Sequence, residues 1–88
     1  MEVRQLNTLI RAAQFQSFSK AAESLGYSQS AVTVQIKALE EELGVRLFDR
    51  MGKRVILTTQ GQRFLEYANT ILDTIHNARF ALNEGAEL

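Results

Sequence analysis

The 88-residue chain contains no cysteine, no proline and no tryptophan. Without cysteine it can form neither a disulfide, a thiolate metal site nor a cysteine nucleophile. Without proline, its helices must end at glycines, at capping residues or at changes of pattern. No apolar run approaches the roughly 20 residues that cross a bilayer, and the N-terminal residues lack the apolar core of a secretory signal. These absences favour a single cytoplasmic domain.

Charge is balanced over the whole chain, which carries ten Lys and Arg and ten Asp and Glu. The two signs are unevenly placed, however. Residues 1–63 hold nine basic against six acidic residues, whereas residues 64–88 hold one against four. This asymmetry is typical of a chain with a nucleic-acid-facing part and a protein-facing part, although mixed surfaces also produce it by chance.

Apolar residues near the N-terminus recur at the spacing of one helix face: Leu6, Leu9, Ile10 and Ala13. They predict a first helix over roughly residues 3–14. A polar break follows, in which Ser17 or Ser19 can cap a second, short helix that ends near Leu25. The inner face of this second helix consists of Ala21, Ala22 and Leu25. Its small residues let another helix approach closely.

Residues 18–37 show the pattern of a helix-turn-helix. Gly26 stands where a left-handed residue ends the second helix, and Ser28 is a candidate N-cap for a third helix from about Gln29 to Leu43. At about 100° per residue, the apolar residues of this helix form one stripe: Val32, Ile36, Leu39 and Leu43. The opposite side carries polar residues and one valine: Ser30, Val34, Lys37 and Glu41, with Thr33 on the flank.

This opposite side is a candidate DNA-reading surface. Gln29, Ser30 and Thr33 are short donors and acceptors that can reach base edges or phosphates, and Val34 suits a thymine methyl group. The acidic residues 40–42 lie only at the C-terminal end of the helix. An ordinary solvated surface is the competing interpretation, but the preceding short helix and glycine turn favour a recognition helix.

Two short β-prone segments, LFDR (47–50) and RVIL (54–57), predict a hairpin joined through residues 51–53. They make a predicted wing over residues 46–57. The wing carries four cations, and one acid offsets part of their charge: Arg46, Arg50, Lys53 and Arg54, with Asp49. On a projecting tip such cations suit phosphate contact or minor-groove insertion, although ordinary surface charge explains them equally well.

The remaining residues, 59–88, predict one long helix. Thr58 or Thr59 begins it, and Thr59 with Gln62 fits a capping box. Its apolar residues are spaced alternately four and three apart in a heptad seam that two leucines widen: Phe64, Ala68, Ile71, Ile75, Ala78 and Leu82, with Leu65 and Leu72. Residues 1–58 are too small a domain to cover this seam along its whole length. The seam therefore predicts a partner helix, most simply from a second copy of the chain.

The sequence does not support an enzyme. His76 is the only histidine, and with no cysteine to share a metal it is best interpreted as a packed or exposed helix residue. No glycine-rich nucleotide-binding loop and no Ser-His-Asp set can be assembled. Acidic pairs have no pocket to serve in so small a chain. We expect no catalytic residue, no metal site and no cofactor in this chain.

Three blocks in succession resemble the N-terminal DNA-binding domain of LysR-type transcriptional regulators: FSKAAESL with GYSQSAVT, then QIKALEEELGVRLFDR, then LT followed by Gly61. The likeness covers roughly residues 3–63, and the rest resembles the linker helix of that family. It implies a mainly α fold. Residues 1–58 would form a winged helix-turn-helix of three helices and a β-hairpin, and residues 59–88 a dimerising linker helix.

The resemblance also implies sequence-specific binding of double-stranded DNA. The expected form is a homodimer, joined through antiparallel linker helices, on an interrupted palindrome; a tetramer is a further option for a full-length protein. Family members continue into a C-terminal effector-binding domain of two α/β subdomains, which would bind a small-molecule effector. We expect that domain to be absent from this chain.

By position, the resemblance assigns Gln29, Ser30 and Thr33 to bases and phosphates, Lys37 and Arg50 to phosphates, and Lys53 or Arg54 to the minor groove. Ser19, Lys20, Ser28 and Val34 complete the candidate DNA contacts. This chain departs from the family at Ser30, where proline is usual, and at Val34, where arginine is common and often reads guanine. Valine cannot donate a hydrogen bond, so we expect the preference at that base to shift toward thymine.

A second hypothesis remains open from the residues alone. A winged-helix module can serve protein contact or oligomerisation, with DNA binding incidental. The heptad seam supports association in either case and does not separate the two hypotheses.

Overall fold

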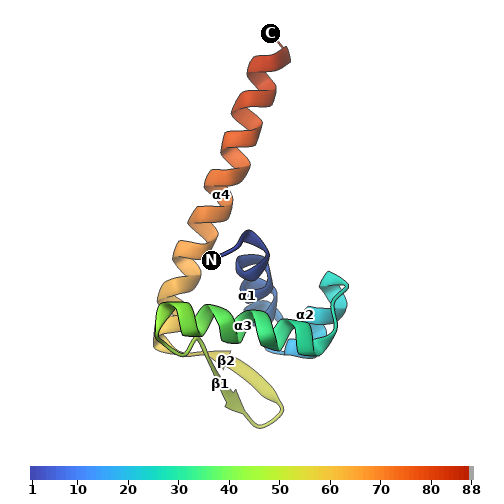
Figure 1. Cartoon of the computed structure of the whole chain (residues 1–88), viewed down its shortest axis with the longest axis vertical. Coiled ribbons are helices and arrows are strands. Elements are labelled where there is room, and N and C mark those ends of the chain that lie inside the picture. Colours follow the sequence, from blue (N-terminus) through green and yellow to red (C-terminus); the bar gives the residue numbers. More distant parts are fainter. Residues whose placement is uncertain (88) are drawn as a thin grey trace.

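The computed structural model describes the backbone of residues 1–87 and the side chains of residues 1–83 (Figure 1). The described residues form four helices and one hairpin: α1 (Val3–Phe15), α2 (Phe18–Leu25), α3 (Gln29–Leu43), β1 (Phe48–Met51), β2 (Arg54–Leu57) and α4 (Thr59–Glu87). The mainly α, winged helix-turn-helix architecture predicted from the sequence is confirmed. No described helix is long and apolar enough to cross a membrane.

Serine caps and left-handed glycines set the limits of the helix-turn-helix, as predicted. Of the two candidate caps for α2, Ser17 serves, and its Oγ accepts a hydrogen bond from the Lys20 amide (3.1 Å). Gly26 ends α2 with φ of +75°. Ser28 caps α3, where its Oγ accepts from the Ala31 amide (3.1 Å). Each device satisfies backbone groups that a helix end leaves unpaired.

The core lies between α1, α2 and α3 and extends to the hairpin and the first turns of α4. Its buried apolar residues are Leu6, Leu9, Ala12, Ala21, Ala22, Val32, Ile36, Leu39, Leu47, Phe48, Val55 and Ala68. Ala21 and Ala22 are the predicted small residues that allow α2 to approach its neighbours. Among the described side chains one polar residue, Thr8, is fully buried. Its hydroxyl donates a hydrogen bond to Gln35 Oε1 (2.6 Å), which joins α1 to α3.

The hairpin is fastened to the helices both at its base and near its turn. Its strands are antiparallel, with Phe48 opposite Leu57 and Met51 opposite Arg54, so β1 begins one residue later than predicted. The Val55 amide donates to the Gln16 carbonyl in the α1–α2 turn (3.0 Å). The Phe18 and Phe48 rings meet edge to face, with centroids 5.3 Å apart. The wing is therefore held against α2.

The start of α4 corrects one prediction. The residue that caps α4 is Thr58, which directly precedes the helix. Its Oγ1 accepts a hydrogen bond from the Gly61 amide (2.9 Å) and donates one to the Arg46 carbonyl (2.6 Å). The expected capping box of Thr59 and Gln62 is wrong, because the capping hydroxyl is that of Thr58 and Thr59 is already the first residue of the helix.

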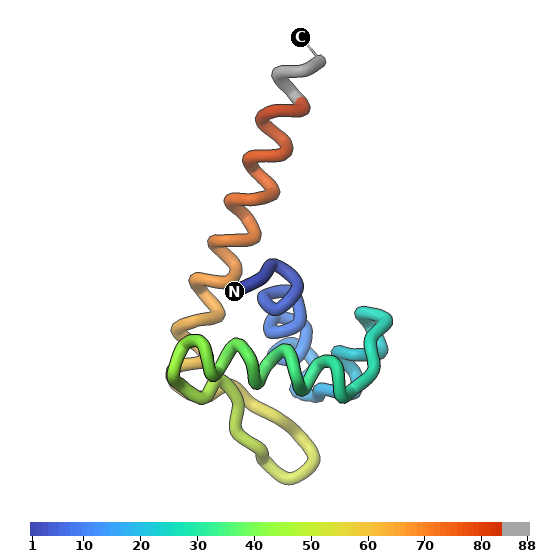
Figure 2. Tube along the Cα trace, viewed as in Figure 1, coloured from blue at the N-terminus to red at the C-terminus, as the bar shows by residue number. Residues whose placement is uncertain are grey.

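Beyond its first turns, α4 leaves the domain as a projecting stalk (Figures 1 and 2), and the molecule measures 53 × 26 × 19 Å. Ala68 is 0% exposed because it packs into the core of its own chain. The predicted dimer contact at Ala68 is therefore wrong. Phe64 and Leu72 are partly covered by the same core, whereas Ile71 is 36% exposed and Leu82 76% exposed.

Candidate nucleic-acid interface

The outer face of α3 is open, as its helical pattern predicted. Val32, Ile36 and Leu39 are buried on the inner side. On the outer side Gln29, Ser30, Val34 and Lys37 are exposed, and Thr33 is half-buried. The face therefore offers an amide, hydroxyls, an ammonium group and one apolar side chain along the N-terminal half of the helix.

Hydroxyl groups on this face are partly engaged within the helix. Thr33 Oγ1 donates to the Gln29 carbonyl (3.1 Å), and Ser30 Oγ lies 3.2 Å from Ser28 Oγ. The side chains of Gln29 and Lys37 form no hydrogen bond or ion pair within residues 1–83. These two groups are thus the ones ready to bind an external partner.

The N-terminal end of α2 contributes two more predicted residues. Ser19 and Lys20 are both exposed, and Ser19 Oγ lies 3.1 Å from the capping Ser17 Oγ. Amide groups at a helix N-terminus and a nearby ammonium group are an arrangement that suits a phosphate.

Three of the four predicted cations of the wing are disposed for contact with a partner. Arg50, Lys53 and Arg54 are exposed, and none of the ion pairs among the described side chains includes them. Arg54 Nη1 donates only to Gln16 Oε1 (3.4 Å). Arg46 differs, because it pairs with Asp49 (3.4 Å) and donates to the Phe48 carbonyl (3.1 Å). Arg46 therefore supports β1, and Asp49 offsets its charge.

Glu40 is a positioning residue that the sequence did not reveal. Its carboxylate accepts hydrogen bonds from the Leu47 amide (2.7 Å) and the Phe48 amide (3.3 Å). It thereby ties the end of α3 to the start of the wing, while Glu41 and Glu42 remain exposed. The only available signal was its place about 80° from Val32, at the border of the apolar stripe.

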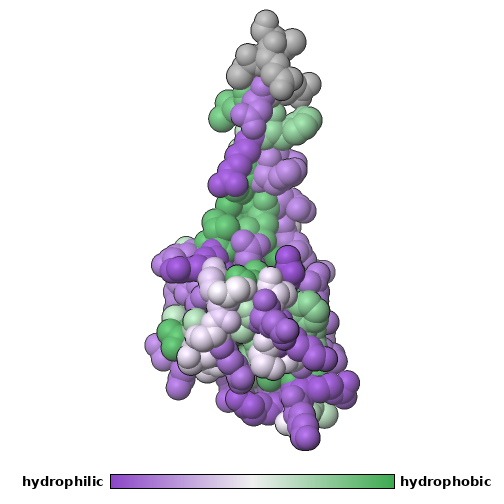
Figure 3. Space-filling model, turned by 90° about the vertical axis from the view of Figure 1, so that its right-hand side faces the viewer, coloured by the Kyte–Doolittle hydropathy of each residue, from purple (hydrophilic) through white to green (hydrophobic). Residues whose placement is uncertain are grey.

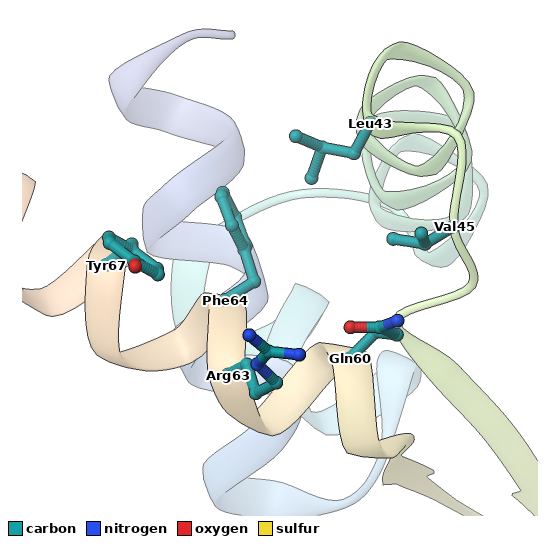
Figure 4. Close-up of a pocket in the computed structure, with 6 residues that line it drawn as sticks. All are labelled: Leu43, Val45, Gln60, Arg63, Phe64 and Tyr67. Carbon is teal, nitrogen blue, oxygen red and sulfur yellow. The ribbon is translucent and has the colours of Figure 1, made fainter.

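A groove separates the C-terminal end of α3 from the first turns of α4 (Figure 4). It is lined by Leu43, Val45, Gln60, Arg63, Phe64 and Tyr67. Tyr67 is 67% exposed at its edge. Further along α4, apolar side chains gather on the stalk, as the green surface in Figure 3 shows.

The exposed apolar residues of the stalk include one that the predicted seam omits. Phe80 is 63% exposed and lies about 160° around the helix from Leu82.

Among the described side chains no group of three His, Asp or Glu residues is placed to hold a metal ion.

The fold and this surface define a class of protein. An open helix at the second position of a helix-turn-helix, beside a cationic hairpin, is the arrangement of a winged helix-turn-helix DNA-binding domain. Residues 3–62 match the model of one family, described as bacterial regulatory helix-turn-helix protein, lysR family. The chain belongs to that family.

Individual relatives agree with this assignment. The chain is 48% identical over 87 residues to the uncharacterized HTH-type transcriptional regulator YwqM of Bacillus subtilis (strain 168), a match of 99% of this chain and 30% of that protein. It is 41% identical over 83 residues to the HTH-type transcriptional regulator CitR of the same strain, covering 94% of this chain and 28% of CitR. The chain thus spans about a third or less of the length of these relatives.

Solved structures share the whole fold. The crystal structure of the CbnR DNA-binding domain in complex with DNA superimposes with a TM-score of 0.93 at 37% identity, over 98% of this chain and 99% of that one. The BenM DNA-binding domain with benA site 1 DNA gives a TM-score of 0.92 at 35% identity, over 98% and 97% of the two chains.

Proposed function

We propose that this chain is the part of a LysR-type transcriptional regulator that binds double-stranded DNA in a sequence-specific manner. In this proposal α3 enters the major groove, and the wing lies near the minor groove. The observation that carries it is the open face of α3, where Gln29 and Lys37 lack partners among the described side chains. The exposed cations Arg50, Lys53 and Arg54 lie on the adjoining hairpin and suit phosphates.

The likeness to the CbnR and BenM domains supports this proposal, since both of those domains were crystallised with DNA. The family is one of regulators, and we propose no catalytic activity and no cofactor for this region. As a regulator of bacterial genes the protein would act in the cytoplasm, where the chromosome lies.

We further propose that the active form is a homodimer joined through α4. The free part of the predicted seam supports this, because Ile71 and Leu82 are exposed and Ile75 is half-buried. Two copies of the domain related by a two-fold axis would meet an interrupted palindrome, one half-site each.

The spacing of the seam fits the antiparallel pair that the family resemblance implies. In the register that places Phe64 opposite Leu82 of the second copy, Ile71 falls opposite Ile75, so the stripe reads the same in both directions. This register would also place Leu82 over the groove beside Phe64 and Tyr67.

The relatives are about three times as long as this chain, and we propose that its full-length protein carries an effector-binding domain after α4. The small-molecule effector, and the choice between activation and repression, would belong to that part. A tetramer would likewise depend on it.

A selection of bound sequences from random DNA duplexes tests the DNA-binding proposal. We expect an enriched motif with two similar half-sites. Absence of an enriched motif at every salt concentration would overturn the sequence-specific function. Unchanged amide shifts at Gln29 and Lys53 in an NMR titration with duplex DNA would instead favour a module for protein contact.

A further inference from the structure

Val34 is the exposed apolar residue in the middle of a polar helix face. It is 66% exposed, whereas Val32, two residues earlier on the same helix, is fully buried. Its exposed neighbours one turn away are Ser30, Lys37 and the small residue Ala38. Val34 therefore contributes little to the core, and a β-branched residue does not favour a helix. Folding of this chain gives no reason for an apolar side chain here.

The groups around Val34 narrow what this face can recognise. α3 contains no arginine, so the side chain that most often reads guanine in the major groove is absent from it. The Thr33 hydroxyl already donates to the Gln29 carbonyl (3.1 Å), so it is not a free donor. The groups that remain near Val34 are the Ser30 hydroxyl, which lies 3.2 Å from Ser28 Oγ, the Gln29 amide, the Lys37 ammonium group and the valine itself.

We propose that Val34 recognises the C5-methyl group of a thymine, which makes it a specificity-determining residue. This inference rests on the proposed DNA binding by α3. The thymine methyl is the one apolar group that a base pair presents in the major groove, and contact with it removes two apolar surfaces from water. Each half-site would then contain one thymine whose methyl group, rather than its oxygen, is recognised.

Modified bases distinguish recognition of the thymine methyl group from recognition of the thymine oxygen. At the position read by Val34, deoxyuridine has the hydrogen-bonding groups of thymine but lacks the methyl, so it should bind more weakly. 5-Methylcytosine carries the methyl on a different base, so it should be accepted better than cytosine there. A reader of the thymine oxygen would show neither preference.

The test starts from the duplex that the selection enriches and replaces each thymine in turn with deoxyuridine. We expect one position in each half-site where the affinity falls about four-fold, which corresponds to about 0.8 kcal/mol for one methyl group. In a second duplex, which has cytosine in place of that thymine, replacing the cytosine with 5-methylcytosine should raise the affinity by a similar factor. Binding is measured by fluorescence anisotropy at one fixed salt concentration.

The variant Val34→Ala tests whether Val34 is the residue that causes this preference for the methyl group. Alanine retains only the Cβ methyl, so in this variant the effect of deoxyuridine at that position should shrink, while the other positions keep their preferences. Val34→Ile should retain the effect. The control is Val3→Ala, an exposed valine on α1 (44% exposed), which should leave every preference unchanged.

Two results would overturn the proposal while leaving DNA binding intact. One is equal affinity for thymine and deoxyuridine at every position of an enriched motif. The other is a deoxyuridine effect that persists undiminished in Val34→Ala. Failure of the selection to enrich any motif would instead remove the proposed function, and this inference with it.

Discussion

Glycine serves two different purposes in this chain at the level of single residues. Gly26 ends α2 in the left-handed region, which other residues rarely adopt. Gly61 is needed for space instead. A Cβ at Gly61 would overlap the Leu47 carbonyl oxygen and lie 2.9 Å from Leu57 Cδ2. The first turn of α4 can therefore pack on the wing only because residue 61 has no side chain.

Gly61→Ala should destabilise the domain. The added methyl must move either α4 or the backbone at Leu47, and overpacking of this kind costs roughly 1–3 kcal/mol in free energy of unfolding. Urea denaturation followed by circular dichroism measures the change. Gln60→Ala, at an exposed position of the same turn, is the control and should be close to neutral. Equal midpoints for the two variants would contradict the close packing.

Two polar residues of α3 should affect DNA binding in different ways. Lys37→Ala should weaken binding to all sequences alike and reduce the salt dependence by about 0.9 in slope per half-site, about 1.8 for the dimer, because each copy loses one phosphate contact. Gln29→Ala should instead alter the preference at one base pair, by roughly 1–3 kcal/mol. Affinities for the enriched duplex and single-base variants, measured at several salt concentrations, separate the two. A uniform loss in both variants would contradict the assignment of Gln29 to a base.

Residues with local partners were predictable from the sequence. Ser28 and Gly26 bind backbone groups within five residues of themselves, so short patterns identify them. Thr58 and Glu40 were not predictable in their full roles, because Thr58 donates to Arg46 and Glu40 accepts from Leu47. Such contacts depend on the tertiary arrangement of the chain, which a local sequence pattern does not predict.

The wing is the element whose stability depends most on its surroundings. Two strands of four residues each are marginal on their own. The Phe18–Phe48 contact and the Glu40 carboxylate hold the hairpin at its base. The Val55–Gln16 backbone hydrogen bond holds β2 near the turn. The tip of the hairpin, with Lys53, remains exposed. The cations of the wing are thus carried at a defined position relative to α3.

Glu40→Ala should loosen the wing. The amides of Leu47 and Phe48 would lose their acceptor, and an unsatisfied buried donor costs about 1–3 kcal/mol. We expect a lower free energy of unfolding and faster hydrogen exchange at these two amides, measured by NMR. Glu41→Ala removes the same charge from an exposed neighbour and should change neither quantity. Similar effects of both substitutions would mean that charge, and not the hydrogen bonds, stabilises the junction.

At the scale of the whole molecule, the protein consists of a compact domain and a projecting helix. The sequence predicted both parts, because heptad spacing identifies a helix and its apolar side. It could not state where the domain's own core ends along that helix. The core covers Ala68 and part of Phe64 and Leu72, so the free stripe begins near Ile71. Which residues of α4 are covered and which are free depends on packing between residues that are distant in the chain, and a heptad pattern does not predict such packing.

Ile71→Lys should convert the proposed dimer into a monomer. A lysine in the seam would bury a charge without a partner, which is costly. Sedimentation velocity measures the change in mass, and circular dichroism verifies that the helix remains. Asn77→Lys introduces the same charge at an exposed position about 120° away from Ile71 around α4 and should leave the dimer intact. A dimer that persists in Ile71→Lys would place the interface elsewhere.

The direction and register of the pair can be tested with cysteines, because the chain has none of its own. In the proposed antiparallel register Phe64 of one copy faces Leu82 of the other, whereas the two copies of residue 64 lie about 27 Å apart along the axis. A disulfide requires Cα atoms within about 7 Å. Phe64→Cys and Leu82→Cys should therefore fail to cross-link when each is oxidised alone.

A mixture of these two variants, allowed to exchange subunits before oxidation, should give a covalent dimer on a non-reducing gel. Phe64→Cys mixed with Asn77→Cys is the control and should remain uncross-linked. Cross-linking of either variant alone would indicate a parallel pair. A parallel pair would place both domains at the same end of the stalk, whereas an antiparallel pair places them at opposite ends. Both arrangements are two-fold symmetric and fit inverted half-sites, but they hold the two recognition helices at different separations. The cross-link therefore also tests the separation that the proposed dimer imposes on the two half-sites of its operator.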